Sequence, residues 1–180
     1  MSQLLFPDNT VLVNFALINR MDLLERLVNG RGRWCATVAS ECARSAQEPG
    51  LGAMTIAWEI FGAPLYPESG AEHLDVRGLR LELSQPGDPA HMHLGEAETL
   101  AIMIRRDVDG YFVTDDGDAR RLARKHDVQV VSTWDLLRLA SRCDFVDGDA
   151  LWGYIQTLHT EQRGGPRGVR DRASFDVWRR

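Results

Sequence analysis

The chain has 180 residues, of which 44% are hydrophobic and 26% charged. This composition fits one globular domain and excludes disordered, collagen-like and coiled-coil proteins. The net charge of −5 excludes a uniformly basic protein that coats nucleic acid, although six arginines against two aspartates give residues 163–180 a local charge of +4. No apolar run approaches the roughly 18 residues of a membrane span. The N-terminus lacks the features of a secretory signal, so we expect a cytoplasmic protein with no membrane partner.

Apolar periodicity predicts the elements of the first half of the chain. The expected elements are a strand at 4–6, a helix at 11–28, a strand at 33–37, helices at 38–46 and 54–61, an irregular segment at 64–78 and a strand at 79–83. The strand at 79–83 is predicted from its strict alternation, LRLEL. Asn29 and the glycines beside it are typical of the turn that ends the helix at 11–28.

The second half of the chain alternates regularly between helices and short strands. The expected elements are helices at 95–105, 116–126 and 133–142, strands at 111–113 and 128–131, and a last helix that begins at Asp147 or Asp149 and ends near Leu158. Such alternation predicts an α/β fold, with a parallel sheet and helices on both faces. We divide the chain into a main domain at 1–145 and a segment at 146–180, which packs on that domain or on a partner subunit. From Gly164 onward we expect a basic tail that is mobile by itself.

Acidic residues gather where a parallel sheet binds its ligands, at the carboxyl ends of the strands. Asp8 follows the first expected strand, and Asp115, Asp116 and Asp118 follow the strand at 111–113. Carboxylates that converge on one point repel each other unless a cation neutralises them, and hard oxygen ligands suit Mg²⁺ or Mn²⁺. A cation held in this way lowers the pKa of a bound water and offsets charge on a phosphoryl oxygen. With 26 acids in the chain, however, any one of them taken alone is more often a solvated surface residue.

Five sequence segments together resemble the motifs of the PIN-domain family. They are FPDNTVLVNF at 6–15, VASE at 38–41, LGEAETLA at 94–101, VTDDGDARRLA at 113–123 and VQVVSTWDLL at 128–137. The resemblance covers roughly residues 3–142, and the order and spacing of the motifs match as well. It implies a three-layer α/β/α fold with a five-stranded parallel sheet.

The same resemblance implies a metal-dependent ribonuclease. Its catalytic residues would be Asp8, Glu41, Glu96 and Asp116, and Asp8, Glu96, Asp116 and Asp118 would bind Mg²⁺ or Mn²⁺. The products would carry 5′-phosphate and 3′-hydroxyl ends. Many members of the family are VapC-type toxins of toxin–antitoxin pairs and commonly dimerise, so an antitoxin protein is a further expected partner.

Neighbouring acids compete for the same role. Glu96 and Glu98 point about 200° apart on a helix, so we assign Glu96 to the metal and Glu98 to an accessory or solvated position. Asp116 is preferred to its neighbour Asp115, which becomes accessory. Thr114 either holds a water or a phosphate or caps the following helix.

Basic and aromatic residues give further candidates. Arg120, Arg121 and Arg124 begin beside the acids and could contact an RNA backbone, although a solvated helix face is the plainer interpretation. His91 and His93 are interpreted as surface histidines. Four tryptophans are assigned to the core or to interfaces, and the three cysteines are interpreted as small buried side chains: Trp34, Trp58, Trp134, Trp152, Cys35, Cys42 and Cys143.

The functional prediction is therefore an RNA-cleaving enzyme. The alternative is a catalytically inactive PIN-fold module that binds RNA or protein, and the four filled acid positions favour catalysis. A phosphatase-like hydrolase ranks third, because the first strand lacks a DxDx-type nucleophile motif. A homodimer is expected from two apolar stripes, which comprise Met54, Trp58, Phe61, Leu151, Trp152, Ile155 and Leu158.

Overall fold

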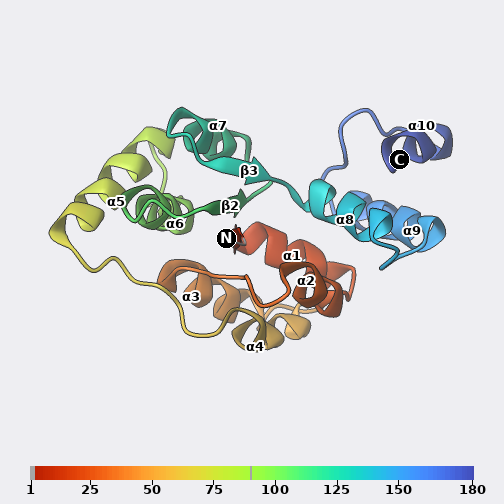
Figure 1. Ribbon diagram of the computed structural model, residues 1–180, viewed down its shortest axis with the longest axis horizontal. Helices are drawn as coiled ribbons and strands as arrows, with labels where there is room; N and C mark the ends of the chain where they lie inside the picture. Colours follow the sequence, from red (N-terminus) through yellow and green to blue (C-terminus); the bar gives the residue numbers. More distant parts are fainter. Residues whose placement is uncertain (1–2, 90) are drawn as a thin grey trace.

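A computed structural model describes residues 3–89 and 91–180 of the chain. Their elements are β1 (Leu4–Pro7), α1 (Asn9–Leu17), α2 (Met21–Val28), α3 (Ala36–Ser45), the 3₁₀ helix η1 (Gly52–Ile56), α4 (Ala57–Phe61), α5 (Gly70–Leu83), α6 (Leu94–Arg105), β2 (Gly110–Val113), α7 (Gly117–Lys125), β3 (Gln129–Val131), α8 (Thr133–Arg142), α9 (Gly148–Thr160) and α10 (Arg172–Trp178). Figure 1 shows their arrangement. None of these helices is long and apolar enough to cross a membrane.

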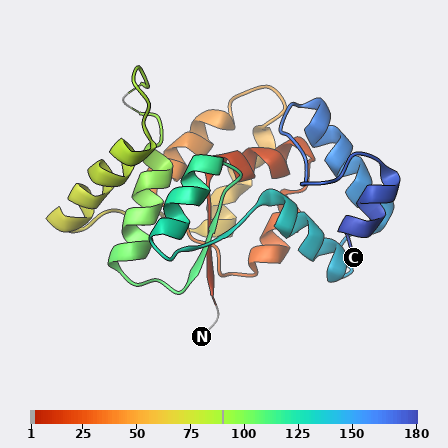
Figure 2. The same ribbon diagram turned by 90° about the horizontal axis from the view of Figure 1, so that it is seen from above.

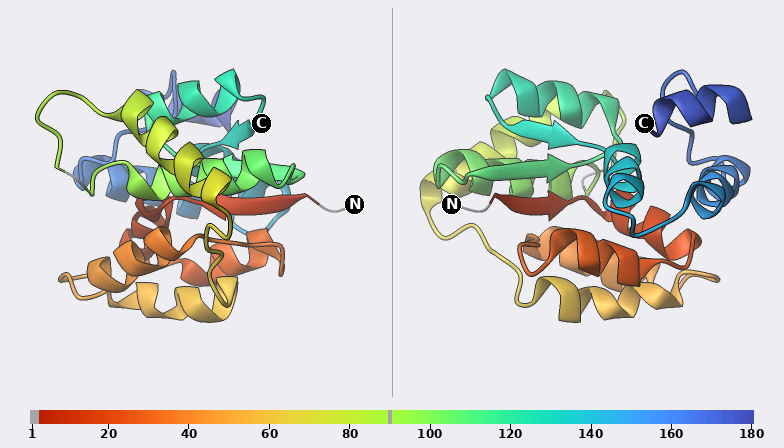
Figure 3. Two further views of the ribbon diagram at one scale, coloured as in Figure 1. Left: turned by 90° about the vertical axis from the view of Figure 1, so that its left-hand side faces the viewer. Right: turned by 45° about the vertical axis from the view of Figure 1, so that its right-hand side comes forward.

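A parallel sheet with the strand order β1-β2-β3 lies at the centre of the fold. The right-hand view of Figure 3 shows the three strands side by side with their arrowheads pointing the same way. The expected count of five strands is therefore wrong for the described residues. The segment around residues 32–35 forms only isolated parallel bridges, from Gly32 to Leu5 and from Cys35 to Leu65. These bridges continue the sheet beyond β1 without making further strands.

Alternate side chains of the strands face two separate cores, as expected for a sheet covered on both faces. Leu5 and Val113 belong to a core that also includes residues of α1–α4, α8, α9 and α10. Phe6 and Phe112 point to the other core, which α5, α6 and α7 complete. The structure thus has the helix–sheet–helix layering that the sequence predicted.

Residues 64–83 differ most from the sequence prediction, because residues 79–83 form the end of α5 and not a strand. Leu79 and Leu83 are one helical turn apart and buried, whereas Leu81 is 71% exposed. Ser69 begins the helix with a capping box, in which its side chain accepts a hydrogen bond from the backbone N–H of Glu72. The alternating leucines therefore have helical spacing on one face, with one extra leucine exposed to solvent.

The expected helix at 11–28 is two helices, α1 and α2. Asn19 lies between them in the left-handed region at φ 53°. The backbone N–H of Arg20 donates to the carbonyl of Phe15, which closes the end of α1. The chain therefore reverses direction where apolar periodicity alone suggested continuity.

The C-terminal segment is also ordered differently from the prediction. Residues 172–178 form α10, whose Phe175 is fully buried against Trp152 of α9 with ring centroids 5.0 Å apart. Figure 2 shows α9 and α10 together at one end of the molecule, opposite α5. The tail is thus docked on the fold rather than mobile by itself.

Replacing Phe175 by alanine is expected to release α10, because a buried aromatic side chain anchors it. Limited trypsin digestion followed by mass spectrometry should then show much faster cleavage after Arg170 and Arg172 than in the wild type. Val177→Ala is the matched control, since Val177 is 73% exposed on the same helix. Equal cleavage rates in all three proteins would contradict this docking.

The two apolar stripes that predicted a homodimer lie mostly inside the fold. Met54, Phe61, Leu151, Ile155 and Leu158 are all buried within the one chain. Trp58 is 49% exposed and makes an edge contact with the buried Trp34. The prediction that these stripes would be left exposed by a single chain is therefore wrong for most of their residues. The homodimer itself stays a prediction. Of the three free cysteines, Cys35 and Cys42 are buried as expected, whereas Cys143 is exposed.

Candidate active site

Asp8 is the most deeply buried acid of the predicted site. It follows β1 directly, and its backbone N–H donates to the carbonyl of Val113 at 2.9 Å, which fixes it at the carboxyl end of the sheet. Its Oδ2 accepts hydrogen bonds from the hydroxyls of Thr10, at 2.7 Å, and Thr114, at 3.2 Å. Burial, together with repulsion from Glu96, raises the pKa of Asp8 to about 6, against the lowering effect of these hydrogen bonds.

Glu41 and Glu96 approach Asp8 from two different helices, α3 and α6. Burial raises the pKa of Glu41 to about 7, and repulsion from Asp8 and then Glu96 adds to this rise. Glu41 lies against the start of α6, because a Cβ placed on Gly95 would come within 3.0 Å of Glu41 Oε2. The glycine beside Glu96 thus allows the α3 carboxylate to approach this end of α6. Three of the four predicted catalytic acids therefore interact electrostatically in one partly buried cluster.

Asp116 caps α7 beside this cluster, with its Oδ1 accepting a hydrogen bond from the backbone N–H of Ala119 at 2.7 Å. Thr114 links it to Asp8, since the Thr114 hydroxyl donates to Asp8 and accepts from the backbone N–H of Asp116 at 3.2 Å. Thr114 thus orients one candidate ligand and positions the backbone of another. Asp118, in the first turn of α7, forms an ion pair with Arg121 at 2.7 Å on the exposed surface.

The two accessory acids have structural partners. Asp115 accepts hydrogen bonds from Asn14 Nδ2 at 2.8 Å and from the backbone N–H and hydroxyl of Thr133 at 2.9 and 2.5 Å. Glu98 is buried rather than solvated, and accepts from the backbone N–H and hydroxyl of Thr37 at 3.2 and 2.6 Å. Asp116 accepts one such bond, at Oδ1, and Glu96 lies 3.7 Å from the ring of His93. Asp116 and Glu96 are therefore the less engaged member of each pair and the better candidates for holding a ligand.

The donor set fits a hydrated divalent cation. No group of three histidine, cysteine or acidic side chains in the described part of the chain is close enough to form a ready-made metal centre. Burial raises the pKa values of Asp8 and Glu41, and repulsion between the carboxylates adds to the rise. A divalent cation would offset both costs of holding these oxygens as charged groups. Mg²⁺ commonly keeps several waters and needs only one or two carboxylates from the protein.

Comparison with known protein families identifies the family of this chain. A family model described as a PIN domain matches residues 6–164. The chain belongs to the PIN-domain family. No curated protein and no solved structure matches it. PIN domains are generally nucleases, so this PIN domain has a nuclease-type fold, which agrees with nucleic-acid binding and hydrolysis.

Sequence reasoning missed a polar network behind the acids. Asn14 is buried on α1 and donates to Asp115 and to Thr133 Oγ1, at 2.8 and 3.1 Å. Arg163, just after α9, donates its Nε to Asn14 Oδ1 at 2.7 Å and its Nη2 to the carbonyl of Thr10 at 3.3 Å. The polar Asn14 within the apolar run of α1 could have indicated this network. No sequence feature indicated its contact with Arg163, which is 149 residues away in the chain.

Replacing Asp115 by alanine is expected to lower the free energy of unfolding by about 2–4 kcal/mol, because buried donors on Asn14 and Thr133 lose their acceptor. Asp118→Ala is the matched control and should change stability by no more than about 0.5 kcal/mol, since it breaks only an exposed ion pair. Urea unfolding followed by circular dichroism measures both changes. An equal effect of the two substitutions would contradict the structural role of Asp115.

Proposed function

We propose that this PIN domain is a metal-dependent endoribonuclease that hydrolyses RNA phosphodiester bonds. The observation that carries the proposal is the cluster of Asp8, Glu41 and Glu96, in which burial first and mutual repulsion second raise the pKa values of Asp8 and Glu41. Asp8, Glu96 and Asp116 would hold Mg²⁺ or Mn²⁺. The cation, when bound, would supply positive charge against the charge that develops on the phosphoryl group and would lower the pKa of a nearby water.

The chain's own residues then have distinct roles. Thr10 and Thr114 donate to the same oxygen of Asp8, so they fix the orientation of its carboxylate. Glu41 belongs to the cluster but is not one of the three residues assigned to the cation, so we give it the role of accepting and returning a proton. Asp118 is exposed and paired with Arg121, so we give it no direct part in holding the cation.

Incubating the purified protein with a 5′-labelled single-stranded RNA tests this proposal. We expect cleavage with Mg²⁺ or Mn²⁺, none with EDTA, and products that carry 5′-phosphate and 3′-hydroxyl ends. Glu59→Gln is a matched control, because this exposed acid of α4 lies outside the cluster. Binding of RNA with no cleavage under either metal would replace the proposal with a non-cleaving RNA-binding module.

A toxin of a toxin–antitoxin pair is the finer form of the same proposal. Induced expression of the wild-type chain should then arrest growth, and expression of Asp8→Asn should not. Co-expression of a short antitoxin encoded beside it should restore growth. Unimpaired growth with an enzyme that is active in vitro would point instead to a housekeeping nuclease.

A further inference from the structure

A polar cavity of about 440 Å³ lies between one side of α7, the start of α8 and the C-terminal segment. Its lining includes the side chains of three arginines, two tryptophans and one acid, which are Arg120, Arg124, Arg167, Trp134, Trp178 and Asp135. Its volume falls within the roughly 300–1,000 Å³ that small-ligand sites occupy. Two of its walls come from motifs of the PIN domain, whereas Pro166, Arg167 and Trp178 lie beyond the residues that the family model matches.

The cavity carries excess positive charge. Arg120, Arg124 and Arg167 face a single carboxylate, that of Asp135. Asp135 already accepts hydrogen bonds from the backbone N–H and hydroxyl of Ser132, at 2.9 and 2.6 Å. Among the described residues, Arg120 Nε is buried with no hydrogen-bond partner. Because a guanidinium stays charged at all relevant pH values, this combination favours an anion with several acceptor oxygens.

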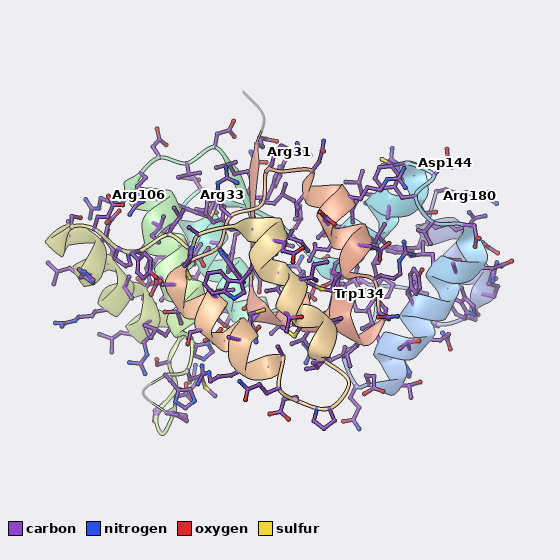
Figure 4. The ribbon with its side chains drawn as sticks, turned by 90° about the horizontal axis from the view of Figure 1, so that it is seen from below. Arg31, Arg33, Arg106, Trp134, Asp144 and Arg180 are labelled. Carbon is purple, nitrogen blue, oxygen red and sulfur yellow. The ribbon has the colours of Figure 1, made fainter. Side chains whose placement is uncertain are left out.

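Two tryptophans add a second kind of recognition. Trp134 and Trp178 are both partly exposed and line the cavity from α8 and α10. Figure 4 labels Trp134, which lies on the side of the molecule toward the C-terminal helices. Within the described residues, the rings of Trp134 and Trp178 do not pair with each other. The ring centroids of Trp178 and Phe175 are 6.1 Å apart. A planar base stacks on such rings, and arginines beside them bind the adjoining phosphate.

The cavity adjoins the candidate active site. Gly117 in its lining follows Asp116 directly, and Thr133 next to Ser132 is hydrogen-bonded to Asp115. The cavity therefore borders the segments that carry Asp115 and Asp116, next to the acid cluster where the scissile phosphate of the proposed RNA substrate would lie. Trp134, assigned from sequence to the core or an interface, and the C-terminal tail then have one shared role.

We propose that this cavity binds one nucleotide of the single-stranded RNA substrate, with its base on Trp134 or Trp178 and its phosphate on Arg120, Arg124 and Arg167. The inference rests on the proposed ribonuclease function and adds a subsite to it. The segment after residue 164 is then a substrate-binding addition to the PIN domain rather than a simple appendage.

Binding of a fluorescent 12-nucleotide single-stranded RNA in EDTA, measured by anisotropy, tests the subsite without cleavage. Arg124→Ala with Arg167→Ala should weaken binding about tenfold or more and reduce the slope of log K against log salt by about 0.7 for each lost phosphate contact. Trp178→Leu should weaken binding by a similar factor and leave the salt slope unchanged. Lysine at both arginine positions should retain most of the affinity.

Arg142→Ala is the matched control, because Arg142 is an exposed arginine at the opposite end of α8. Circular dichroism of each variant shows whether its fold is retained, and the exposed Arg124 and Arg167 make the double variant the safer probe. If the folded double variant binds RNA with the affinity and salt slope of the wild type and still cleaves it, the subsite proposal is wrong and the nuclease proposal stands. A wild type that binds RNA through this cavity but cleaves none would instead overturn the nuclease proposal.

Discussion

Replacing Asp8 by asparagine is expected to reduce Mn²⁺-dependent cleavage of single-stranded RNA by about a thousandfold or more. The substitution removes the most buried charge of the cluster but keeps an oxygen that can accept from Thr10 and Thr114. A bound cation contributes several kcal/mol to stabilising a phosphoryl transition state, and each 1.4 kcal/mol is a factor of ten in rate. Initial rates at saturating RNA and metal measure the loss.

Controls separate this effect from damage to the fold. Asp118→Asn should retain cleavage within a fewfold of the wild type, because Asp118 pairs with Arg121 on the surface. Asp8→Asn should also show the same circular dichroism spectrum as the wild type. Cleavage by a folded Asp8→Asn protein at the wild-type rate would remove Asp8 from the active site.

The metal-free protein is expected to lose stability as the pH rises from about 4 to about 7. The pKa values of Asp8 and Glu41 rise from 3.8 and 4.5 to about 6 and 7 on folding. Within this window the folded chain keeps protons that the unfolded chain has released, so the free energy of unfolding falls with pH. Above pH 7 both carboxylates are charged in the folded chain, so the free energy of unfolding is lowered by the full cost of burying these two charges.

Glu41→Gln and Asp8→Asn should each flatten this pH dependence. Each should also raise the free energy of unfolding at pH 8 by on the order of 2 kcal/mol, since a shift of one pKa unit corresponds to about 1.4 kcal/mol. Urea unfolding in EDTA between pH 4 and 8 measures the profile. Added Mn²⁺ should stabilise the wild type and have less effect on Asp8→Asn, which loses a charged ligand. A wild-type profile that rises steadily over this range and matches both variants would show that folding does not raise the pKa values of Asp8 and Glu41.

The sequence predicted the parts of the fold that rest on repeated local patterns. The strands at 4–6, 111–113 and 128–131, and the helices that follow the last two strands, lie where periodicity indicated. The strand at 79–83 was wrong because Leu79, Leu81 and Leu83 alternate with a period of two, whereas Leu79 and Leu83 alone also fit the spacing of one helical turn. The decisive signal was the SGAE capping box at 69–72, which marks the start of a helix that includes these leucines.

The candidate site was predictable in its acids and not in its surroundings. Asp8, Glu41 and Glu96 were identified from motifs, and the structure brings them together. Which member of each acidic pair is free depends on Thr133 and Thr37, and these partners are distant in sequence. The role of Arg163 and the docking of α10 depend on tertiary contacts that no local pattern encodes.

The central claim, that the acid cluster binds a divalent cation, is tested most directly by the anomalous scattering of manganese in crystals grown with Mn²⁺. The account predicts a strong anomalous peak within coordination distance of the Asp8 and Glu96 carboxylates, and its loss in Asp8→Asn crystals. An ordered cluster with no peak under saturating Mn²⁺, or a peak confined to other acids such as Asp118, would contradict it.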